Sequence, residues 1–372
     1  MGTSGFLRDH HERKKGVEMK VLILPSNIAS MPAITTDRLL KRGVQVRALF
    51  LDTNNYQQQS AALEFPLKGL RFGWPHKLWN FSRFLFHAVR GIIWADVIHY
   101  CGSFNKQLDI LLFPLIRLLK KPALVEWVGS DIRIPEVEFV DNPYYKKAYH
   151  NGYEYPYESM AQSLDTQMRF KKAGFHPLVF PGMEQYILKD IFPDYYRFIQ
   201  RIDLGDYTPV PPSVDVKKPR IVHAPTAPVA KGTNYIEEAL GQLKSEFDFE
   251  YVRAYKMKRT DVLKEIAQCD IFVDQIILGS YGMAAMEAFA FAKPVVCFMK
   301  PSVLECFPEN SPIINANPDS IKDVLRKLLS DAVFRNGAGI NSRKYAEKYH
   351  DIDSCIDELI SIYYTVIGRA NK

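Results

Sequence analysis

Residues 274–296 read DQIILGSYGMAAMEAFAFAKPVV. An apolar strand ends at Gln275, a loop with Gly279 and Gly282 follows, and a helical pattern begins near Met283. Glycines let backbone amides approach an anion closely, and a helix N-terminus adds free N–H groups and a partial positive charge. This unit therefore predicts a cradle for a diphosphate. An ordinary turn between a strand and a helix is the alternative.

Glu287 lies just over one turn into the predicted helix. An ionised carboxylate only accepts hydrogen bonds, which suits the paired hydroxyls of a ribose. A solvated surface glutamate is the alternative for this position. His223 ends an earlier strand and either contacts a bound donor or is a buried core histidine; the core role is favoured.

Strands and helical patterns alternate on both sides of this stretch. From residue 220 onward the alternation is regular, and the N-terminal half opens with KVLILPSNIAS, a strand that runs into a short polar loop. Such alternation is typical of parallel α/β sheets. We therefore predict two doubly wound, Rossmann-like parallel-sheet domains. Ligands of such sheets bind beyond the carboxyl ends of the strands, so the site should lie in the cleft between the domains.

A proline-rich stretch, DYTPVPPSVDVKKP at 206–219, predicts the linker between the domains. Residues 19–205 then form an N-terminal, acceptor-side domain, and 220–350 form the C-terminal domain for the nucleotide. Residues 351–372 predict a final helix. The polar, charged tail 1–18 is expected to be disordered or an addition for expression, and it does not read as a signal peptide.

Composition narrows the function classes. The formal net charge of +6 over 372 residues is small and dispersed, which argues against nucleic acid. It fits a nucleotide diphosphate or an anionic membrane surface. The five cysteines form no CxxC pair, so buried, reduced thiols and a cytoplasmic location are expected. No apolar run reaches the roughly 20 residues of a membrane span.

Several short motifs resemble the retaining glycosyltransferase family 4, the glycosyl transferases group 1, which have the GT-B architecture. They are KGT at 231–233, DIFVDQ at 270–275, GSYG at 279–282 and EAFAFAKPVV at 287–296. The resemblance implies that Lys231 contacts the donor diphosphate and that Glu287 holds the ribose. The closing segment KYHDIDSCIDELISIYY is also similar, which implies that the last helix crosses back onto the first domain.

Two departures from the family are visible. The family often carries two glutamates eight positions apart, and the first would fall on Gly279. Many members also have an arginine shortly before the lysine, whereas APTAPVAKG contains none. The candidates for a replacement cation are Arg253, Lys256, Lys258 and Arg259. A solvated strand end is the alternative for that cluster.

The expected donor site combines the second domain with the SNIAS loop of the first. Its residues are Glu287, Lys231, Gly232, Thr226, Gly279, Ser280, Tyr281, Gly282, Met283, Asn27 and Ile28. The asparagine of SNIAS would alternatively cap the following helix.

The acceptor side is expected to use EWVGSDIR, which is similar to the family's Gly-Ser-Asp-x-Arg segment, and a tyrosine-rich stretch at 144–157. Its residues are Gly129, Ser130, Arg133, Tyr153 and Tyr155. Asp131 would orient a reacting hydroxyl, which makes it, with Lys231, a candidate catalytic residue. A local turn with an Asp131–Arg133 ion pair, and tyrosines packed on the domain surface, are the alternatives.

The segment 71–94 combines aromatic residues with four basic ones. Its apolar residues follow helical spacing, as expected of a helix packed on a sheet. The same composition also suits an anionic membrane surface, so a weak peripheral contact with the inner face of the membrane is the second interpretation.

The function implied is transfer of a sugar from a nucleotide-diphosphate sugar to a glycan or lipid-linked acceptor. The resemblance implies retention of configuration and no metal, and the nucleotide sugar is a co-substrate rather than a cofactor. Catalysis would then depend on electrostatic stabilisation of the departing diphosphate. A sugar-nucleotide epimerase and a catalytically silent binding subunit of the same fold are the alternatives.

Overall fold

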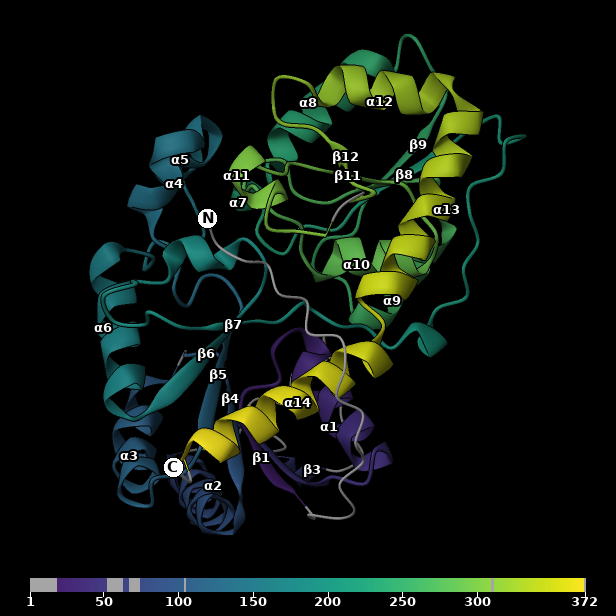
Figure 1. Cartoon of the computed structure of the whole chain (residues 1–372). Coiled ribbons are helices and arrows are strands. Elements are labelled where there is room, and N and C mark those ends of the chain that lie inside the picture. Colours follow the sequence, from purple (N-terminus) through teal and green to yellow (C-terminus); the bar gives the residue numbers. More distant parts are fainter. Residues whose placement is uncertain (1–18, 52–62, 67–73, 104, 309–310, 371–372) are drawn as a thin grey trace, which may run out of the picture.

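The computed structural model describes residues 19–51, 63–66, 74–103, 105–308 and 311–370. The predicted tail 1–18 lies outside the described residues. The chain forms two lobes, each built on a parallel sheet with helices on both faces (Figure 1). The predicted pair of doubly wound domains is confirmed.

The N-terminal domain contains a seven-stranded sheet in the order β3-β2-β1-β4-β5-β6-β7, and every neighbouring pair is parallel. Its strands are β1 (Lys20–Pro25), β2 (Gln45–Phe50), β3 (Leu63–Pro66), β4 (Val97–Cys101), β5 (Ala123–Trp127), β6 (Phe175–Val179) and β7 (Tyr196–Arg197). Strands β4 and β5 are buried along their whole length, as expected of strands covered on both faces.

Two groups of helices cover this sheet. One face carries α2 (Trp74–Trp94), α3 (Lys106–Leu118) and α6 (Met160–Lys172), whose apolar residues join one core cluster. The other face carries α1 (Met31–Lys41) and α14 (Ile352–Ala370), the last helix of the chain, which share a second cluster with the strands. Because α14 packs on α1 and β4, this last helix lies on the N-terminal domain, as the resemblance implied.

The C-terminal domain contains a five-stranded parallel sheet in the order β12-β11-β10-β8-β9. Its strands are β8 (Arg220–His223), β9 (Glu250–Arg253), β10 (Ile271–Val273), β11 (Val295–Cys297) and β12 (Ile314–Asn315). Its helices are α7 (Pro228–Lys231), α8 (Thr233–Leu243), α9 (Arg259–Gln268), α10 (Met283–Ala290), α11 (Pro301–Leu304), α12 (Ile321–Ser330) and α13 (Ala332–Tyr349).

The chain passes between the domains twice, once beyond Ile202 and once between α13 and α14. The two passages are joined by backbone hydrogen bonds: Ile202 N–H donates to His350 O at 2.9 Å, and Ile352 N–H donates to Ile202 O at 3.1 Å. The outgoing and returning segments therefore lie side by side.

A helical excursion of the first domain, α4 (Pro135–Asp141) and α5 (Pro143–Tyr149), rests on the second domain. Its main polar anchor is Lys300, which is fully buried. The Lys300 ammonium donates to Glu138 at 3.1 Å and to Asp141 at 2.8 Å, both on α4. The tyrosine-rich stretch thus contributes to the packing between the domains.

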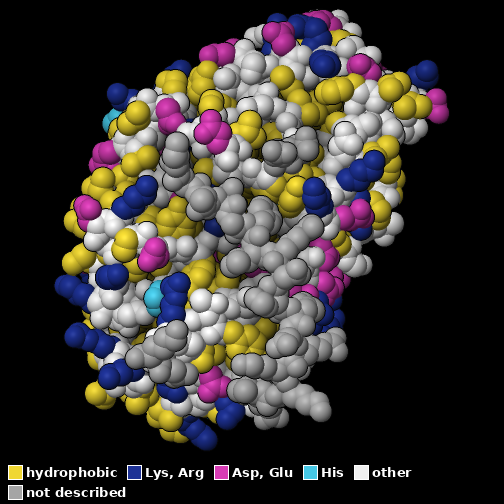
Figure 2. Space-filling model, viewed as in Figure 1, with side chains coloured by type: hydrophobic (Ala, Val, Ile, Leu, Met, Phe, Trp, Pro, Cys, Tyr) yellow, Lys and Arg dark blue, Asp and Glu magenta, His cyan; other side chains and the backbone are white. Residues whose placement is uncertain are grey.

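Basic and acidic side chains are dispersed over both lobes in the view of Figure 2. Among the helices that the structure describes, none has both the length and the apolar character needed to cross a bilayer.

Candidate functional site

A cavity of about 670 Å³ lies between the two domains. Its walls are loops that follow the carboxyl ends of strands: the loop after β1, the residue after β5, and the loops after β8, β9 and β10. The carboxyl ends of the strands in both sheets therefore face this cavity, which is where other doubly wound folds bind their ligands. The predicted residues that line it are Ile28, Tyr155, Thr226, Lys231, Gly282, Met283 and Glu287.

Lys231 ends α7 with its ammonium on the cavity wall. The ammonium donates to Asp274 Oδ1 at 2.9 Å, and Asp274 Oδ2 accepts from the backbone N–H of Gly282 at 2.9 Å. Asp274 is fully buried just after β10. Asp274 therefore holds both the Lys231 ammonium and the backbone at the start of α10 in position on the cavity wall.

Glu287 is buried and forms an ion pair with Arg259, whose guanidinium lies 2.8 Å from its Oε1. Arg259 also donates to the Tyr207 hydroxyl at 3.0 Å. Burial raises the pKa of the Glu287 carboxyl, and the neighbouring Arg259 opposes that shift. Both residues line the cavity, so a ligand here meets a carboxylate acceptor and a cation that are 2.8 Å apart.

His223 has the predicted core role. Its Nδ1 donates to the Val273 carbonyl at 2.9 Å, and its Nε2 accepts from the Thr233 hydroxyl at 2.9 Å. Because the side chain is fully buried, its pKa is lowered to about 4. The imidazole is therefore neutral near neutral pH and does not contact the cavity.

The side chains of Asp131, Arg133 and Tyr153, all expected on the acceptor side, form hydrogen bonds within the first domain. The Asp131 carboxylate accepts from the backbone N–H of Gly129 at 2.9 Å and of Val128 at 3.2 Å, and burial raises its pKa to about 6. It caps the turn after β5 rather than facing the cavity. The residue of this turn that does line the cavity is Val128, whereas Asp131 lies outside the cavity lining. The catalytic role of Asp131 stays a prediction.

Arg133 and Tyr153 also lie outside the cavity lining. Both bind the buried carboxylate of Glu158: Arg133 donates to it at 2.8 Å and the Tyr153 hydroxyl at 2.9 Å. Neither they nor Gly129 and Ser130 line the cavity, and their acceptor-side role stays a prediction. Tyr155 is the member of the tyrosine-rich stretch that reaches the wall.

Several predicted donor residues lie behind the wall. Asn27 accepts from the Ala33 N–H at 3.1 Å and so caps α1. The Tyr281 hydroxyl is buried against His350 Nε2 at 2.9 Å. The others that are not part of the wall are Gly232, Gly279 and Ser280.

Gly279 has a specific steric role. Its φ is +76°, and a Cβ at this position would lie 2.5 Å from Cγ of Lys300. The stem of Lys300 thus passes over Gly279 on its way to α4. The resembling family often has a glutamate at this position. A side chain here would collide with the stem of Lys300.

Sequence reasoning did not assign several cavity residues: Val128, Gln200, Pro225, Tyr255 and Gln275. Asp274 was also missed, although a carboxylate at the end of an apolar strand was a usable signal. Of the four candidate cations, Lys256 and Arg259 line the cavity.

One cluster within the described residues has the composition of a metal site: His99, Cys101 and Glu126. Its carboxylate is already bound by Arg201, at 2.7 and 2.9 Å, and by His99 at 3.2 Å. The buried Arg201 guanidinium holds the pKa of Glu126 well below its usual range. A cation would have to compete with this guanidinium, so the cluster is an ion-pair network that ties β4 and β5 together.

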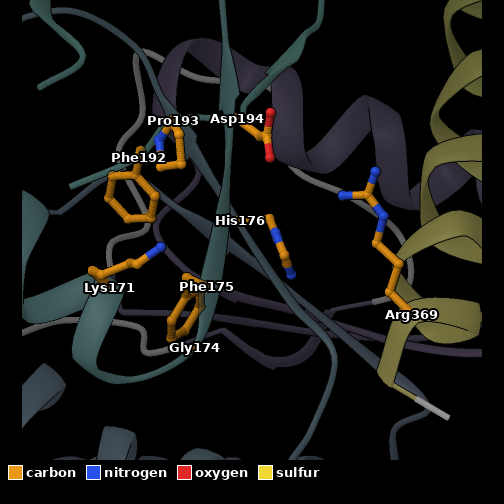
Figure 3. Close-up of a pocket in the computed structure, with 8 residues that line it drawn as sticks. All are labelled: Lys171, Gly174, Phe175, His176, Phe192, Pro193, Asp194 and Arg369. Atoms are coloured by element: carbon orange, nitrogen blue, oxygen red, sulfur yellow. The ribbon is translucent and has the colours of Figure 1, made fainter. Parts of the chain in front are cut away.

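A second hollow of about 250 Å³ lies at the opposite end of the first sheet (Figure 3). Lys171, His176 and Arg369 surround it together with Asp194. They come from the end of α6, the start of β6, the segment before β7 and the end of α14. None of the predicted site residues lies there.

Comparisons with known proteins agree with this architecture. Residues 252–345 match the family model described as Glycosyl transferases group 1. A search of curated proteins found no match.

Among solved structures, sucrose-phosphate synthase from Thermosynechococcus elongatus is similar, with 13% identity, a TM-score of 0.62, and coverage of 95% of this chain and 100% of that chain. HepE from Anabaena in complex with UDP has 11% identity and a TM-score of 0.56, covering 93% and 100%. WaaG, a glycosyltransferase involved in lipopolysaccharide biosynthesis, has 12% identity and a TM-score of 0.56, covering 93% and 99%. At these identities the likeness establishes the fold. The chain therefore has the GT-B fold, and its C-terminal domain resembles the glycosyl transferases group 1.

Proposed function

We propose that this protein is a glycosyltransferase that moves a sugar from a nucleotide-diphosphate sugar to the hydroxyl of a saccharide or lipid-linked acceptor. The observation that carries the proposal is that Lys231 and Glu287 both line one cavity, at the carboxyl ends of the strands of both sheets. The match of 252–345 to glycosyl transferases group 1 supports it. So does the fold shared with HepE, which was solved in complex with UDP.

The roles follow from charge. The Lys231 ammonium lies where it can neutralise a diphosphate that gains negative charge as the sugar leaves. Such stabilisation acts mainly in the transition state and therefore raises turnover. Glu287 can accept hydrogen bonds from ribose hydroxyls, which do not change during transfer, so its contribution is to donor affinity. Arg259 and Lys256 supply positive charge to the same cavity, which carries no arginine from the loop before Lys231.

The chemistry proposed is transfer with retention and without an obligatory metal. Among the residues described at the cavity, Glu287 is the sole carboxylate on the wall and no histidine lines it. Epimerisation of a sugar nucleotide requires acid–base groups around the sugar ring, so this cavity favours the transferase over the epimerase.

Donor binding tests the proposal first. UDP and UDP-glucose should raise the melting temperature, since a ligand at 100 times its dissociation constant adds about 2.7 kcal/mol of stability. Glu287→Gln should weaken donor binding by about one to two orders of magnitude, because a hydrogen bond to a charged group contributes roughly 1.5–3 kcal/mol. Glu265→Gln is the matched control, since Glu265 pairs with Arg220 away from the cavity. Equal affinities in the two variants would contradict the ribose role.

A binding subunit without turnover is the second candidate. It is favoured by one observation: Lys300 occupies the space over Gly279, where the resembling family often carries a glutamate. Release of nucleoside diphosphate from a donor in the presence of saccharide acceptors separates the two. Tight donor binding with no release, over a panel of acceptors, would support the subunit.

A further inference from the structure

The outward side of α2 carries a line of large apolar residues. Trp79, Phe86 and Ile93 are 64%, 57% and 58% exposed. They are seven residues apart, so they project from one side of the helix. The opposite side of α2, with Phe84, Ala88 and Ile92, is buried in the core. The helix is therefore apolar on both sides, and packing on the sheet accounts for the inner side alone.

The neighbouring helix α3 continues this surface. It contacts α2 and buries Leu108, Leu112 and Ile116. Its outward residues Ile110 and Leu111 are exposed, and Leu118 is 78% exposed. We call the exposed residues of the two helices the α2–α3 face. A soluble surface rarely gathers this many large apolar side chains on adjacent elements without a partner.

Among the residues of α2 and α3 whose side chains the structure describes, the exposed charges of the α2–α3 face have one sign. Arg83, Arg90, Arg117 and Lys120 are exposed on it or at its end. Residues 74–94 contain no aspartate or glutamate. The one carboxylate of α3, Asp109, is buried, where Arg169 lies 2.9 Å away and the Tyr100 hydroxyl donates to it.

We propose that the α2–α3 face docks the protein on an anionic lipid bilayer. Apolar side chains with Trp and Phe, interleaved with arginines, suit the boundary between headgroups and acyl chains. The basic residues add electrostatic attraction to anionic headgroups. A protein partner that used this face would need acidic groups matched to arginines spaced along two helices, whereas an anionic bilayer presents negative charge everywhere. In the view of Figure 2, basic and apolar side chains predominate along the lower left rim, where Figure 1 places α2 and α3.

Co-sedimentation of the full chain with vesicles tests the proposal. Binding is expected to vesicles of phosphatidylcholine and phosphatidylglycerol in equal parts at low salt, and not to phosphatidylcholine alone. It should weaken as salt rises, because exposed charges are screened beyond about 8 Å at physiological ionic strength. Arg90→Glu with Arg117→Glu should weaken binding by about 30-fold or more, since each basic residue at an anionic surface contributes roughly a factor of five. Phe86→Ser with Leu118→Ser should also weaken it.

Matched controls come from the linker 206–219 and the C-terminal domain. Lys217→Glu with Lys244→Glu makes the same change of net charge, and Val214→Ser with Val333→Ser removes comparably exposed apolar side chains. These variants should sediment like the parent chain. Circular dichroism melts would be used to check that each variant is folded.

Two results would overturn the proposal. One is binding that is absent at low salt, or lost equally in the controls. The other is a self-associated chain, seen by sedimentation equilibrium without lipid, that the α2–α3 variants turn into monomers. In that case the face joins two copies. Donor binding measured on the same variants should be unchanged, so this proposal can fail while the proposed function stands.

Discussion

At the scale of single residues, the cavity is organised by pairs of opposite charge. Lys231 is held by buried Asp274, and Glu287 by Arg259. In each pair the first residue lines the cavity, and its partner holds the charged group of that residue in place. A bound diphosphate and ribose would compete with Asp274 and Arg259 for the same atoms.

The Lys231 pair gives the first prediction. Lys231→Met should lower turnover by about 100-fold or more, as expected when one stabilising donor at the leaving group is lost. It should also lower the melting temperature, because the buried Asp274 carboxylate loses its cation. Lys231→Met with Asp274→Asn should regain melting temperature but not turnover. Turnover recovered in this double variant would make Lys231 purely structural. Steady-state kinetics and calorimetry measure the two effects.

Gly279 gives the second prediction. Gly279→Ala should destabilise the chain by a few kcal/mol, because a Cβ meets both a left-handed backbone and the stem of Lys300. Gly152→Ala is the control, since Gly152 has a similar φ of +83° with nothing within 4 Å. Urea unfolding should show a clearly smaller loss in the free energy of unfolding for Gly152→Ala than for Gly279→Ala. Equal losses would mean that the crossing of Lys300 imposes no steric demand.

At the scale of elements, the sequence predicted what local patterns determine. Buried strands such as β4, the glycine loop before α10 and the position of Lys231 beyond the carboxyl end of β8 all follow from short motifs. The hydrogen bonds of Asp131 to its own turn could not be predicted this way, because a carboxylate after a strand has the same sequence pattern whether it faces a ligand or caps its own turn. The packing of Tyr153 against Glu158 likewise depends on how α4 and α5 fold back, which no local signal specifies.

The contact between α4 and the second domain gives the third prediction. Lys300→Met should lower the free energy of unfolding by about 3–5 kcal/mol, because it leaves the buried Glu138 carboxylate without its cation. The double variant Lys300→Met with Glu138→Gln should lose less free energy of unfolding than Lys300→Met alone, since both charges are then removed. Lys106→Met, in an exposed pair with Asp165, should change stability by about 1 kcal/mol at most. A double variant as unstable as the single one would show that this pair is not the anchor.

At the scale of the whole molecule, two buried histidines make stability depend on pH. His350 donates through Nδ1 to the Gln200 carbonyl at 2.7 Å and accepts from Tyr281, so it bridges the domains. Its pKa, like that of His223, is lowered to about 4 by burial. Between pH 6.5 and about 4 the unfolded chain takes up protons at these positions and the folded chain does not. Stability is therefore fully present above pH 6.5 and is lost as the pH falls toward 4.

The fourth prediction isolates this effect from other groups. Asp131, whose pKa is raised to about 6, acts in the opposite sense, so the wild-type profile alone is ambiguous. His350→Gln can keep both hydrogen bonds but cannot be protonated. As the pH falls from 6.5 to 4.5, the free energy of unfolding of this variant should decrease by about 1.4 kcal/mol less per pH unit than that of the wild type. Denaturant unfolding at several pH values measures the difference, and parallel profiles would refute it.

The paired passages at Ile202 and His350 have a consequence for how the chain can be divided. Because the last helix completes the first domain, the second domain is in effect an insertion into one loop of the first. Cutting the chain after His350 would strip α14 from the sheet and expose the apolar surface that α1 and α14 share with the strands. Excising 207–348 and bridging the gap with a short flexible linker would keep both passages together, since they are already hydrogen-bonded. The first domain is thus separable by internal deletion and not by truncation, and domain exchange between chains of this fold should follow the same two boundaries.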